Sequence, residues 1–238
     1  MLTIRGLGAG YGAREVLHDV DVDVAPGEIV AVLGRNGSGR STLAKAIAGQ
    51  LAWRGTMHWN QQSLTQLQSF EIARLGIGYV PESRDVFGGL TVQQNLTLGI
   101  KPGLATAAST AAWRDEDVYQ LFPALRVRRH VDAAVLSGGE QQMLALGRCL
   151  MGAPSMVIVD EPTEGLAPAL VQQVAACLRM LQRRGVAVML MEQKMAIALS
   201  IADRVLVMGH GRIVFNGTPT QLRGRTALQT GFILLPLA

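Results

Sequence analysis

A glycine-rich stretch at residues 34–41, with the sequence GRNGSGRS, has the residue types that bind phosphate. It follows an apolar run at residues 29–33, which predicts a buried strand, and precedes a helix-like run that ends at Gly49. Backbone N–H groups at the start of such a helix converge on an anion. The spacing matches the nucleotide loop G-x-x-x-x-G-K-[ST] except at position 40, where the chain has arginine in place of lysine.

The residue types within this stretch suit particular tasks. Gly34, Gly37 and Gly39 let the chain turn tightly and approach phosphates closely, because they carry no Cβ. Ser41 is placed to bring its hydroxyl to Mg²⁺. Arg40 is planar and forked where lysine is a compact point charge, so the replacement is not conservative in a tight loop. Taken alone, the stretch would also fit an ordinary glycine-rich turn between a strand and a helix.

Two adjacent carboxylates, Asp160 and Glu161, follow another apolar run at residues 156–159. Ligands of open α/β sheets bind at the carboxyl ends of the strands, which is where this pair lies. Adjacent strand residues point to opposite sides, so the two acids should have separate tasks. We expect Asp160 to hold Mg²⁺ through water and Glu161 to orient or deprotonate an attacking water.

The sequence LSGGEQQ at residues 136–142 predicts the start of a further helix. Ser137 and Glu140 have the spacing of a capping box, S-x-x-E. A capping box alone does not explain Gly138 and Gly139, because glycine is a poor helix former. Glycines at this place leave backbone N–H groups bare, which suggests a second anion site. Two anion sites in one chain suggest a nucleotide held between two subunits.

The second half of the chain predicts an α/β fold with a mainly parallel sheet. Helical patterns separate three apolar runs, which implies parallel strands joined by right-handed crossovers. A turn at residues 209–211 then predicts a hairpin. The three runs are residues 156–159, 186–190 and 204–208.

The first half predicts a different arrangement. Residues 16–24 alternate apolar residues with aspartates, the pattern of a half-buried antiparallel strand. A short strand is expected at residues 2–4 and an edge strand at residues 53–59, with Tyr11 between them in a glycine-rich loop. Tyr11 would either stack on an adenine ring or pack locally as a turn residue.

Residues at about 84–150 are mainly helical in pattern and interrupt the rhythm of strands. We therefore expect a helical subdomain inserted into one domain that spans residues 1–238. Thr91 should cap a helix that runs to Leu98. Residues 101–112 are rich in Pro, Gly, Ala and Thr and predict a surface connection.

Composition narrows the classes of protein. The 238 residues are 49% hydrophobic and carry a net charge of +4, without a dense Lys/Arg tract, which disfavours a nucleic-acid-binding protein. Cys149 and Cys177 lie in helix-like apolar patterns without metal-ligand spacing, so we expect buried reduced thiols. No signal peptide and no apolar run of about 18 residues is present, which predicts a soluble, cytoplasmic chain.

Together, the motifs at residues 34–42, 136–142 and 157–161 resemble the ATPase subunit of ABC transporters, and the resemblance covers essentially the whole chain. It implies a P-loop NTPase core with a mainly parallel sheet, an N-terminal antiparallel β subdomain and an inserted helical subdomain. It also implies a head-to-tail dimer, in which ATP and Mg²⁺ lie between the phosphate loop of one subunit and LSGGE of the other.

The same resemblance implies roles for individual residues. Tyr11 matches the aromatic residue that stacks on adenine. Glu82 stands where the family usually has glutamine and would bind Mg²⁺ with Ser41 and Asp160. Glu161 would be the catalytic base, and Gln193 stands where the family usually has the histidine that senses the γ-phosphate. The residues assigned to ATP are Gly34, Arg35, Asn36, Gly37, Ser38, Gly39, Arg40, Ser41 and Thr42 in the loop and Ser137, Gly138, Gly139 and Glu140 in LSGGE.

Variations within these motifs resemble one subfamily, the importers of branched-chain amino acids and their amide and urea relatives. These are Val-Pro-Glu at 80–82, Asp-Glu-Pro-Thr-Glu-Gly-Leu-Ala-Pro at 160–168 and Glu-Gln at 192–193. The subfamily implies a second ATPase subunit, transmembrane permease subunits and a periplasmic or extracellular substrate-binding protein as partners. It places the chain peripherally on the inner face of the cell membrane.

Arg40 leaves two functions open. Either the chain is an active transport ATPase, or it is a weakly hydrolysing ATP clamp whose LSGGE stretch completes the site of a paired ATPase. The intact Asp160-Glu161 pair favours the active form. A third class, soluble ABC ATPases that work on DNA or ribosomes, usually has coiled-coil insertions or two fused nucleotide domains, and this chain has neither. We expect Arg40→Lys to raise ATP turnover.

Overall fold

A six-stranded sheet forms the centre of the protein in the computed structural model, which describes residues 1–101 and 113–233. Its order is β10-β9-β3-β8-β7-β6, and all neighbours are parallel except β10, which pairs with β9 as the predicted antiparallel hairpin. The predicted mainly parallel sheet is therefore confirmed. The strands are β3 (Ile29–Leu33), β6 (Ile77–Val80), β7 (Met156–Asp160), β8 (Ala187–Glu192), β9 (Arg204–Gly209) and β10 (Arg212–Gly217).

The N-terminal part of the chain forms a separate antiparallel sheet in the order β2-β1-β4-β5. Two predictions for it are wrong. Tyr11 ends a long strand instead of lying in a loop, because the glycines before it pair closely with β2. The strand at 53–59 is not at the edge, because β5, too short to give an alternating pattern, pairs with it. The strands are β1 (Leu2–Tyr11), β2 (Arg14–Val24), β4 (Trp53–Trp59) and β5 (Gln62–Ser63).

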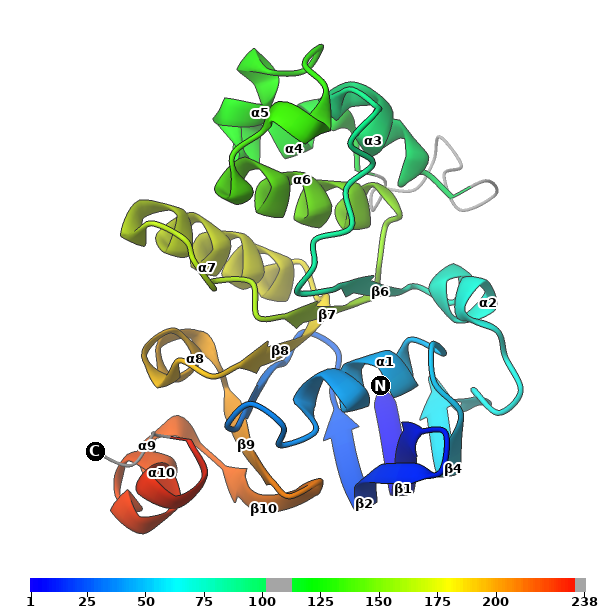
Figure 1. Ribbon diagram of the computed structural model, residues 1–238, viewed down its shortest axis with the longest axis vertical. Coiled ribbons are helices and arrows are strands. Elements are labelled where there is room, and N and C mark those ends of the chain that lie inside the picture. The colour runs from blue at the N-terminus through cyan, green and yellow to red at the C-terminus, as the bar shows by residue number, and fades with distance from the viewer. Residues whose placement is uncertain (102–112, 234–238) are drawn as a thin grey trace.

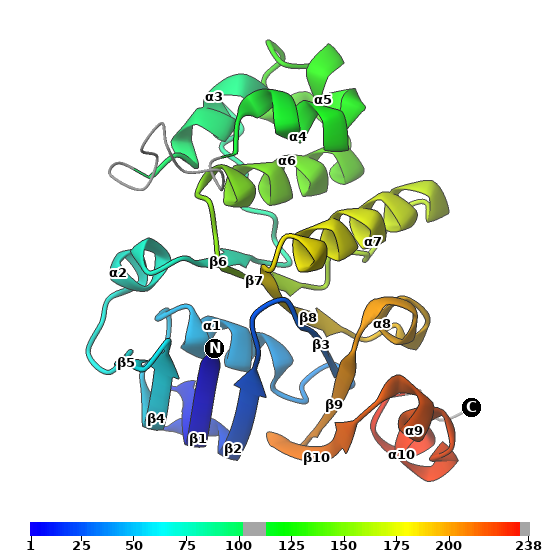
Figure 2. The same ribbon diagram turned by 180° about the vertical axis from the view of Figure 1, so that it is seen from behind.

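Helices α3 to α6 lie together at one end of the molecule, opposite the antiparallel sheet (Figures 1 and 2). Thr91 and Ser137 both form complete capping boxes, so the two predicted helix starts are confirmed. The extent of a helical subdomain at about 84–150 stays a prediction, and most of the expected connection at 101–112 lies outside the described residues. The helices are α3 (Val92–Leu98), α4 (Asp115–Leu121), α5 (Pro123–Val127) and α6 (Gly138–Met151), with a 3₁₀ turn, η1 (Ala133–Val135), before α6.

The remaining helices cover the two faces of the parallel sheet. Because successive strand residues face opposite sides, Val30 and Val32 of β3 pack with α1 and the antiparallel sheet, whereas Ala31 and Leu33 pack with α8 and α9. No helix within the described ranges is long and apolar enough to cross a membrane. These helices are α1 (Arg40–Ile47), α2 (Ser69–Arg74), α7 (Pro168–Arg183), α8 (Met195–Ile201), α9 (Pro219–Arg223) and α10 (Thr226–Phe232).

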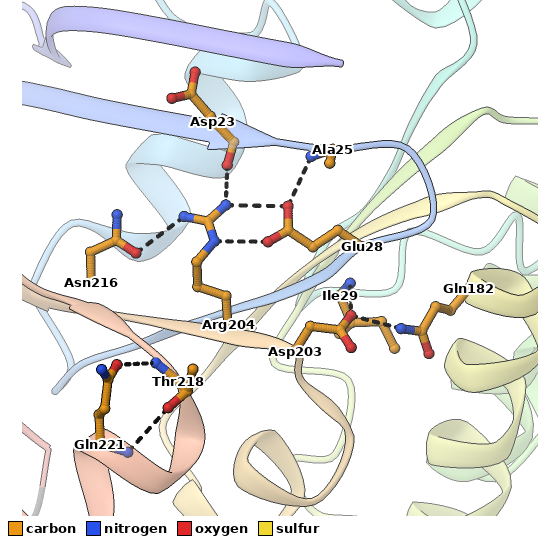
Figure 3. Close-up of polar contacts among 10 residues, drawn as sticks. All are labelled: Asp23, Ala25, Glu28, Ile29, Gln182, Asp203, Arg204, Asn216, Thr218 and Gln221. Carbon is orange, nitrogen blue, oxygen red and sulfur yellow. Dashed lines mark hydrogen bonds and ion pairs between the residues drawn. The ribbon is translucent and has the colours of Figure 1, made fainter.

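One arginine ties the end of β2 to the parallel sheet (Figure 3). Arg204, the first residue of β9, donates from Nε to Glu28 Oε1 at 2.7 Å and from Nη1 to Asn216 Oδ1 at 3.2 Å. Its Nη2 donates to the carbonyl oxygen of Asp23 at 2.5 Å. The turn that leads from β2 into β3 is thereby fixed, which sets the position of β3 and of the loop that follows it.

Candidate functional site

The loop between β3 and α1 has the geometry that the glycine pattern predicts. Gly37 and Gly39 have φ angles of +80° and +109°, a backbone region that residues with a Cβ rarely adopt. A Cβ on Gly39 would also lie 2.8 Å from Leu17 Cδ2. The first N–H groups of α1 have no acceptors within the helix, so they are available to an anion.

A pocket of about 550 Å³ opens beside this loop. Its volume is within the usual range for small-molecule sites. Tyr11 from the end of β1, residues 35–42, Glu82 and Glu161 line it, so most of the predicted site residues come together there. Gly34, Asp160 and Gln193 are not part of its lining. Sequence analysis did not assign Arg14 and Val16, which also line it because they follow Tyr11 into β2.

Arg40 makes an ion pair with Glu161 across this pocket. Its Nη2 lies 2.5 Å from Glu161 Oε1, and the two side chains are only 5% and 10% exposed. The same nitrogen donates to Asn36 Oδ1 at 3.3 Å. The residue that departs from the usual loop pattern therefore contacts the residue expected to activate water.

Asp160 provides a buried carboxylate next to the loop. It is 2% exposed, and its Oδ1 has no hydrogen-bond partner within the described ranges. Burial raises the pKa of Asp160, while hydrogen bonding to Ser41 and the charge of Arg40 oppose this rise. An orphaned carboxylate oxygen, a serine hydroxyl and the nearby Glu82 are hard oxygen donors of the kind that Mg²⁺ prefers, so the residues fit that ion.

The described side chains do not form a metal site made of protein ligands alone. Across residues 1–101 and 113–233, no cluster of three or more His, Cys, Asp or Glu side chains is placed to hold a metal. Mg²⁺ usually keeps several waters and binds through one or two carboxylates together with phosphate oxygens. The geometry therefore suits an ion that arrives with a phosphate ligand.

Glu161 has an unusual backbone and an unusual charge environment. Its φ angle is +47°, a left-handed conformation that costs a residue with a side chain roughly 1–2 kcal/mol. Burial, with smaller contributions from Glu192 and Asp160, raises its pKa to about 7, against the opposing charge of Arg40. A carboxyl group with a pKa near neutrality is suited to exchange protons with water.

Sequence analysis missed Glu192, a fully buried carboxyl group at the end of β8. The hydroxyl of Thr163 donates to its Oε1 at 2.6 Å, and the Lys194 N–H donates to its Oε2 at 3.3 Å. Burial raises its pKa despite these hydrogen bonds. The signal was present, because an acid directly after an apolar run ends a central strand. The neighbouring Gln193, assigned to phosphate sensing, is only half-buried.

The LSGGEQQ stretch lies at the start of α6 and contributes nothing to the pocket lining. Ser137 Oγ accepts from the Glu140 N–H at 3.3 Å, and Glu140 Oε2 accepts from the Ser137 N–H at 2.9 Å. Ser137 and Gly138 are exposed, and the guanidinium of Arg84 lies against Gly138. One chain therefore presents two separate groups of predicted phosphate-binding residues, one in a pocket and one on its surface.

A family model described as "ABC transporter" matches residues 17–164. The chain is 42% identical to the high-affinity branched-chain amino acid transport ATP-binding protein BraG of Pseudomonas aeruginosa, over 93% of this chain and 94% of the relative. It is 35% identical to a probable branched-chain amino acid transport ATP-binding protein, LivF, of Archaeoglobus fulgidus, with coverage of 93% and 94%. It is also 31% identical to the lipopolysaccharide export system ATP-binding protein LptB of Acidithiobacillus ferridurans, with coverage of 93% and 92%.

Solved structures show the same fold. The structure of an ATP-binding subunit of an ABC transporter superposes with a TM-score of 0.84 at 28% identity, over 96% of this chain and 94% of the other. The ADP conformation of an ATP-binding cassette of an ABC transporter superposes with a TM-score of 0.81 at 25% identity, with coverage of 96% of each chain.

Proposed function

Because the chain belongs to the ABC transporter family as an ATP-binding subunit, we propose that it hydrolyses ATP to energise an importer of branched-chain amino acids. The observation that carries the hydrolysis part is that Glu161 lines the same pocket as residues 35–42. The substrate class rests on the 42% identity to BraG. Similarity to LptB at 31% identity makes lipopolysaccharide export the competing assignment.

Each residue of the pocket has its own role, as do Asp160 and Gln193, which lie outside its lining. The N–H groups at the start of α1 and Arg40 bind phosphate, Tyr11 stacks on adenine, and Ser41, Asp160 and Glu82 hold Mg²⁺. When bound, ATP would supply the phosphoanhydride bond that breaks. Mg²⁺ would supply positive charge that stabilises the transferring phosphoryl group. Glu161 takes a proton from the attacking water, for which a pKa of about 7 is well suited. Gln193 senses the γ-phosphate.

The exposed start of α6 serves a second subunit. Ser137, Gly138, Gly139 and Glu140 bind the ATP in the pocket of a partner ATPase, head to tail, because their own pocket lies elsewhere on the chain. Permease subunits carry the substrate across the membrane, a substrate-binding protein delivers it, and the chain works peripherally at the inner face of the membrane.

One observation favours a second candidate function, a weakly hydrolysing clamp. Arg40 holds Glu161 in an ion pair at 2.5 Å, which competes with any task of that carboxylate in water activation. In this form the chain binds ATP, hydrolyses it slowly, and completes the site of a paired ATPase through its LSGGE stretch.

Turnover of Mg-ATP by the purified chain tests the main proposal. We expect steady hydrolysis that falls at least about 100-fold in Glu161→Gln, because the amide cannot accept the proton. Arg40→Lys should raise turnover, since lysine restores a point charge and releases Glu161. Basal turnover no faster than that of Glu161→Gln, together with retained ATP binding, would instead favour the clamp.

Uptake of radiolabelled leucine tests the substrate class. Cells that lack this chain should take up leucine slowly, and the wild-type chain but not Glu161→Gln should restore uptake. Normal leucine uptake in the deleted cells, with defective lipopolysaccharide assembly, would move the assignment to export.

A further inference from the structure

Arg40, the cation of the loop, forms an ion pair with Glu161, the residue proposed to activate water. Arg40 and Glu161 are 2.5 Å apart, and both side chains are at least nine-tenths buried. An ion pair at this depth is screened little by solvent, so it affects any other charged group that enters the pocket. The consequence for phosphate binding goes beyond the division of roles given above, and it rests on the proposed function.

The guanidinium of Arg40 is only partly used by the protein. Its Nη2 serves both Glu161 and Asn36, whereas Nη1 is buried without a hydrogen-bond partner in the described parts of the chain. A buried donor without an acceptor is costly. The pocket that Arg40 lines is the place from which an acceptor oxygen can reach it.

Lysine at position 40 would not reproduce this arrangement. Its ammonium group ends a shorter side chain and has no planar fork that presents two nitrogens in fixed directions. The contact with Glu161 is made by a terminal nitrogen of the guanidinium, the part of the side chain that lysine lacks. The ion pair is therefore a property that this chain gains from arginine.

We propose that Arg40 and Glu161 form an autoinhibitory ion pair, which the phosphate groups of a bound nucleotide open by taking Arg40 as their own cation. In the resting chain the charge of the Glu161 carboxylate is compensated by Arg40, and the ion pair keeps this carboxylate from accepting a proton from water. A phosphate anion competes with the carboxylate for the same guanidinium, and its binding releases Glu161. The carboxylate thus becomes available when a nucleotide is in the pocket.

Competition between two anions for one cation changes the affinity for nucleotide in a direction that can be measured. If Glu161 opposes phosphate at Arg40, removal of the Glu161 charge strengthens nucleotide binding. ADP is the suitable probe, because it brings phosphate to the pocket and lacks the phosphoryl group that hydrolysis removes. The gain must depend on arginine at position 40, which separates competition within the ion pair from general repulsion between Glu161 and phosphate.

The experiment is calorimetric titration of MgADP into four purified chains: wild type, Glu161→Gln, Arg40→Lys and the double variant. We expect Glu161→Gln to bind MgADP about tenfold more tightly than wild type, equal to about 1.4 kcal/mol. In the Arg40→Lys background the same substitution should change affinity less than about twofold. Glu164→Gln is the matched control, because Glu164 lines the same pocket but makes no ion pair with Arg40 in the described structure. Because Glu164 acts on the pocket only through its charge at longer range, its gain in affinity should be smaller than that of Glu161→Gln and should not depend on the residue at position 40.

The outcomes separate the two levels of the proposal. Measurable MgADP binding with equal affinity in wild type and Glu161→Gln overturns the ion-pair inference and leaves the proposed function standing. So does a gain of the same size whether position 40 holds arginine or lysine. If all the chains fold, as shown by cooperative thermal unfolding, and none binds MgADP or MgATP, the proposed function fails and the inference fails with it.

Discussion

At the scale of single residues, the buried hydrogen bond between Thr163 and Glu192 is a sensitive point. Both residues are fully buried, and the bond is 2.6 Å long. Thr163→Val keeps the shape of the side chain but leaves a buried carboxyl oxygen without its donor, which should cost about 1–3 kcal/mol of unfolding free energy. Urea unfolding measures this loss. Thr163→Ser keeps the hydroxyl and is the control; equal stability of the two variants would contradict the prediction.

The cysteines give a second test at this scale. Cys177 is buried, and burial raises the pKa of its thiol to about 12. Because the thiolate is the reactive form, a pKa so far above the ambient pH keeps the thiol unreactive. Iodoacetamide at pH 8 should leave Cys177 unmodified in the folded chain and alkylate it in urea, as mass spectrometry of the peptides can determine. Equal labelling in both conditions would show that the site opens readily.

Residue types alone revealed part of the site. The loop spacing and the apolar run before Asp160 predicted residues 35–42 and Glu161, and the structure places these in one pocket lining. The pairing of Arg40 with Glu161 was not predictable, because it depends on which strands lie side by side. Glu192 was given no role although the sequence shows an acid at the end of an apolar run; its complete burial follows from the central position of β8 and needed the structure.

At the scale of elements, several helices begin with a capping box, among them α3 and α6. Thr91 caps α3 and Ser137 caps α6, each within a complete capping box. Replacing either residue with alanine removes the acceptor for a helix N–H and should cost about 1 kcal/mol of unfolding free energy.

Only one of these caps is proposed to contact nucleotide. Ser137→Ala should therefore lower ATP turnover severalfold beyond its effect on stability, whereas Thr91→Ala, the matched control, should affect stability alone. Urea unfolding and steady-state hydrolysis of both variants check this difference. Equal losses of turnover would mean that Ser137 acts only as a helix cap.

Predictions of elements were accurate for the alternating strands and helices of the second half of the chain and failed in parts of the N-terminal sheet. The strands and helices after residue 150 alternate clearly, and all of them are present. Tyr11 was assigned to a loop because glycine is depleted in strands and Gly8 and Gly10 precede it. Both glycines nevertheless lie inside β1. A Cβ on Gly10 would lie 2.0 Å from the Arg14 carbonyl oxygen, so close strand pairing explains the glycine.

At the scale of the whole molecule, Arg204 connects the end of β2 and the start of β3 to β9 and β10 (Figure 3). Arg204→Met removes four hydrogen bonds, three of them partly buried, and leaves Glu28 without its cation. We expect a loss of about 1.5–3 kcal/mol in unfolding free energy.

A second arginine provides the comparison. Arg5 pairs with Asp23 in an ion pair whose side chains are 49% and 38% exposed, so Arg5→Met should lower the free energy of unfolding clearly less than Arg204→Met does. Urea unfolding of both variants measures the two losses. If the two losses are equal, the contacts of Arg204 between the two sheets add no more to the free energy of unfolding than an exposed ion pair does.

The order of strands was beyond sequence analysis. Alternation of strands and helices predicts parallel pairing, but it does not state which strands are neighbours. That β8 separates β3 from β7 follows only from the complete packing of the sheet, on which α1, α7 and α8 cover the faces.

This strand order bears on the timing of the proposed cycle. Neighbouring strands lie about 4.8 Å apart, so β3 and β7 are separated by roughly 10 Å, and their burial keeps that separation constant. An exchange of partners by Arg40 therefore needs only rotations about side-chain bonds. Collective movements of domains take microseconds to milliseconds, far longer than such rotations. The pace of a transport cycle would then be governed by whole subunits meeting and parting, with the arginine following almost at once.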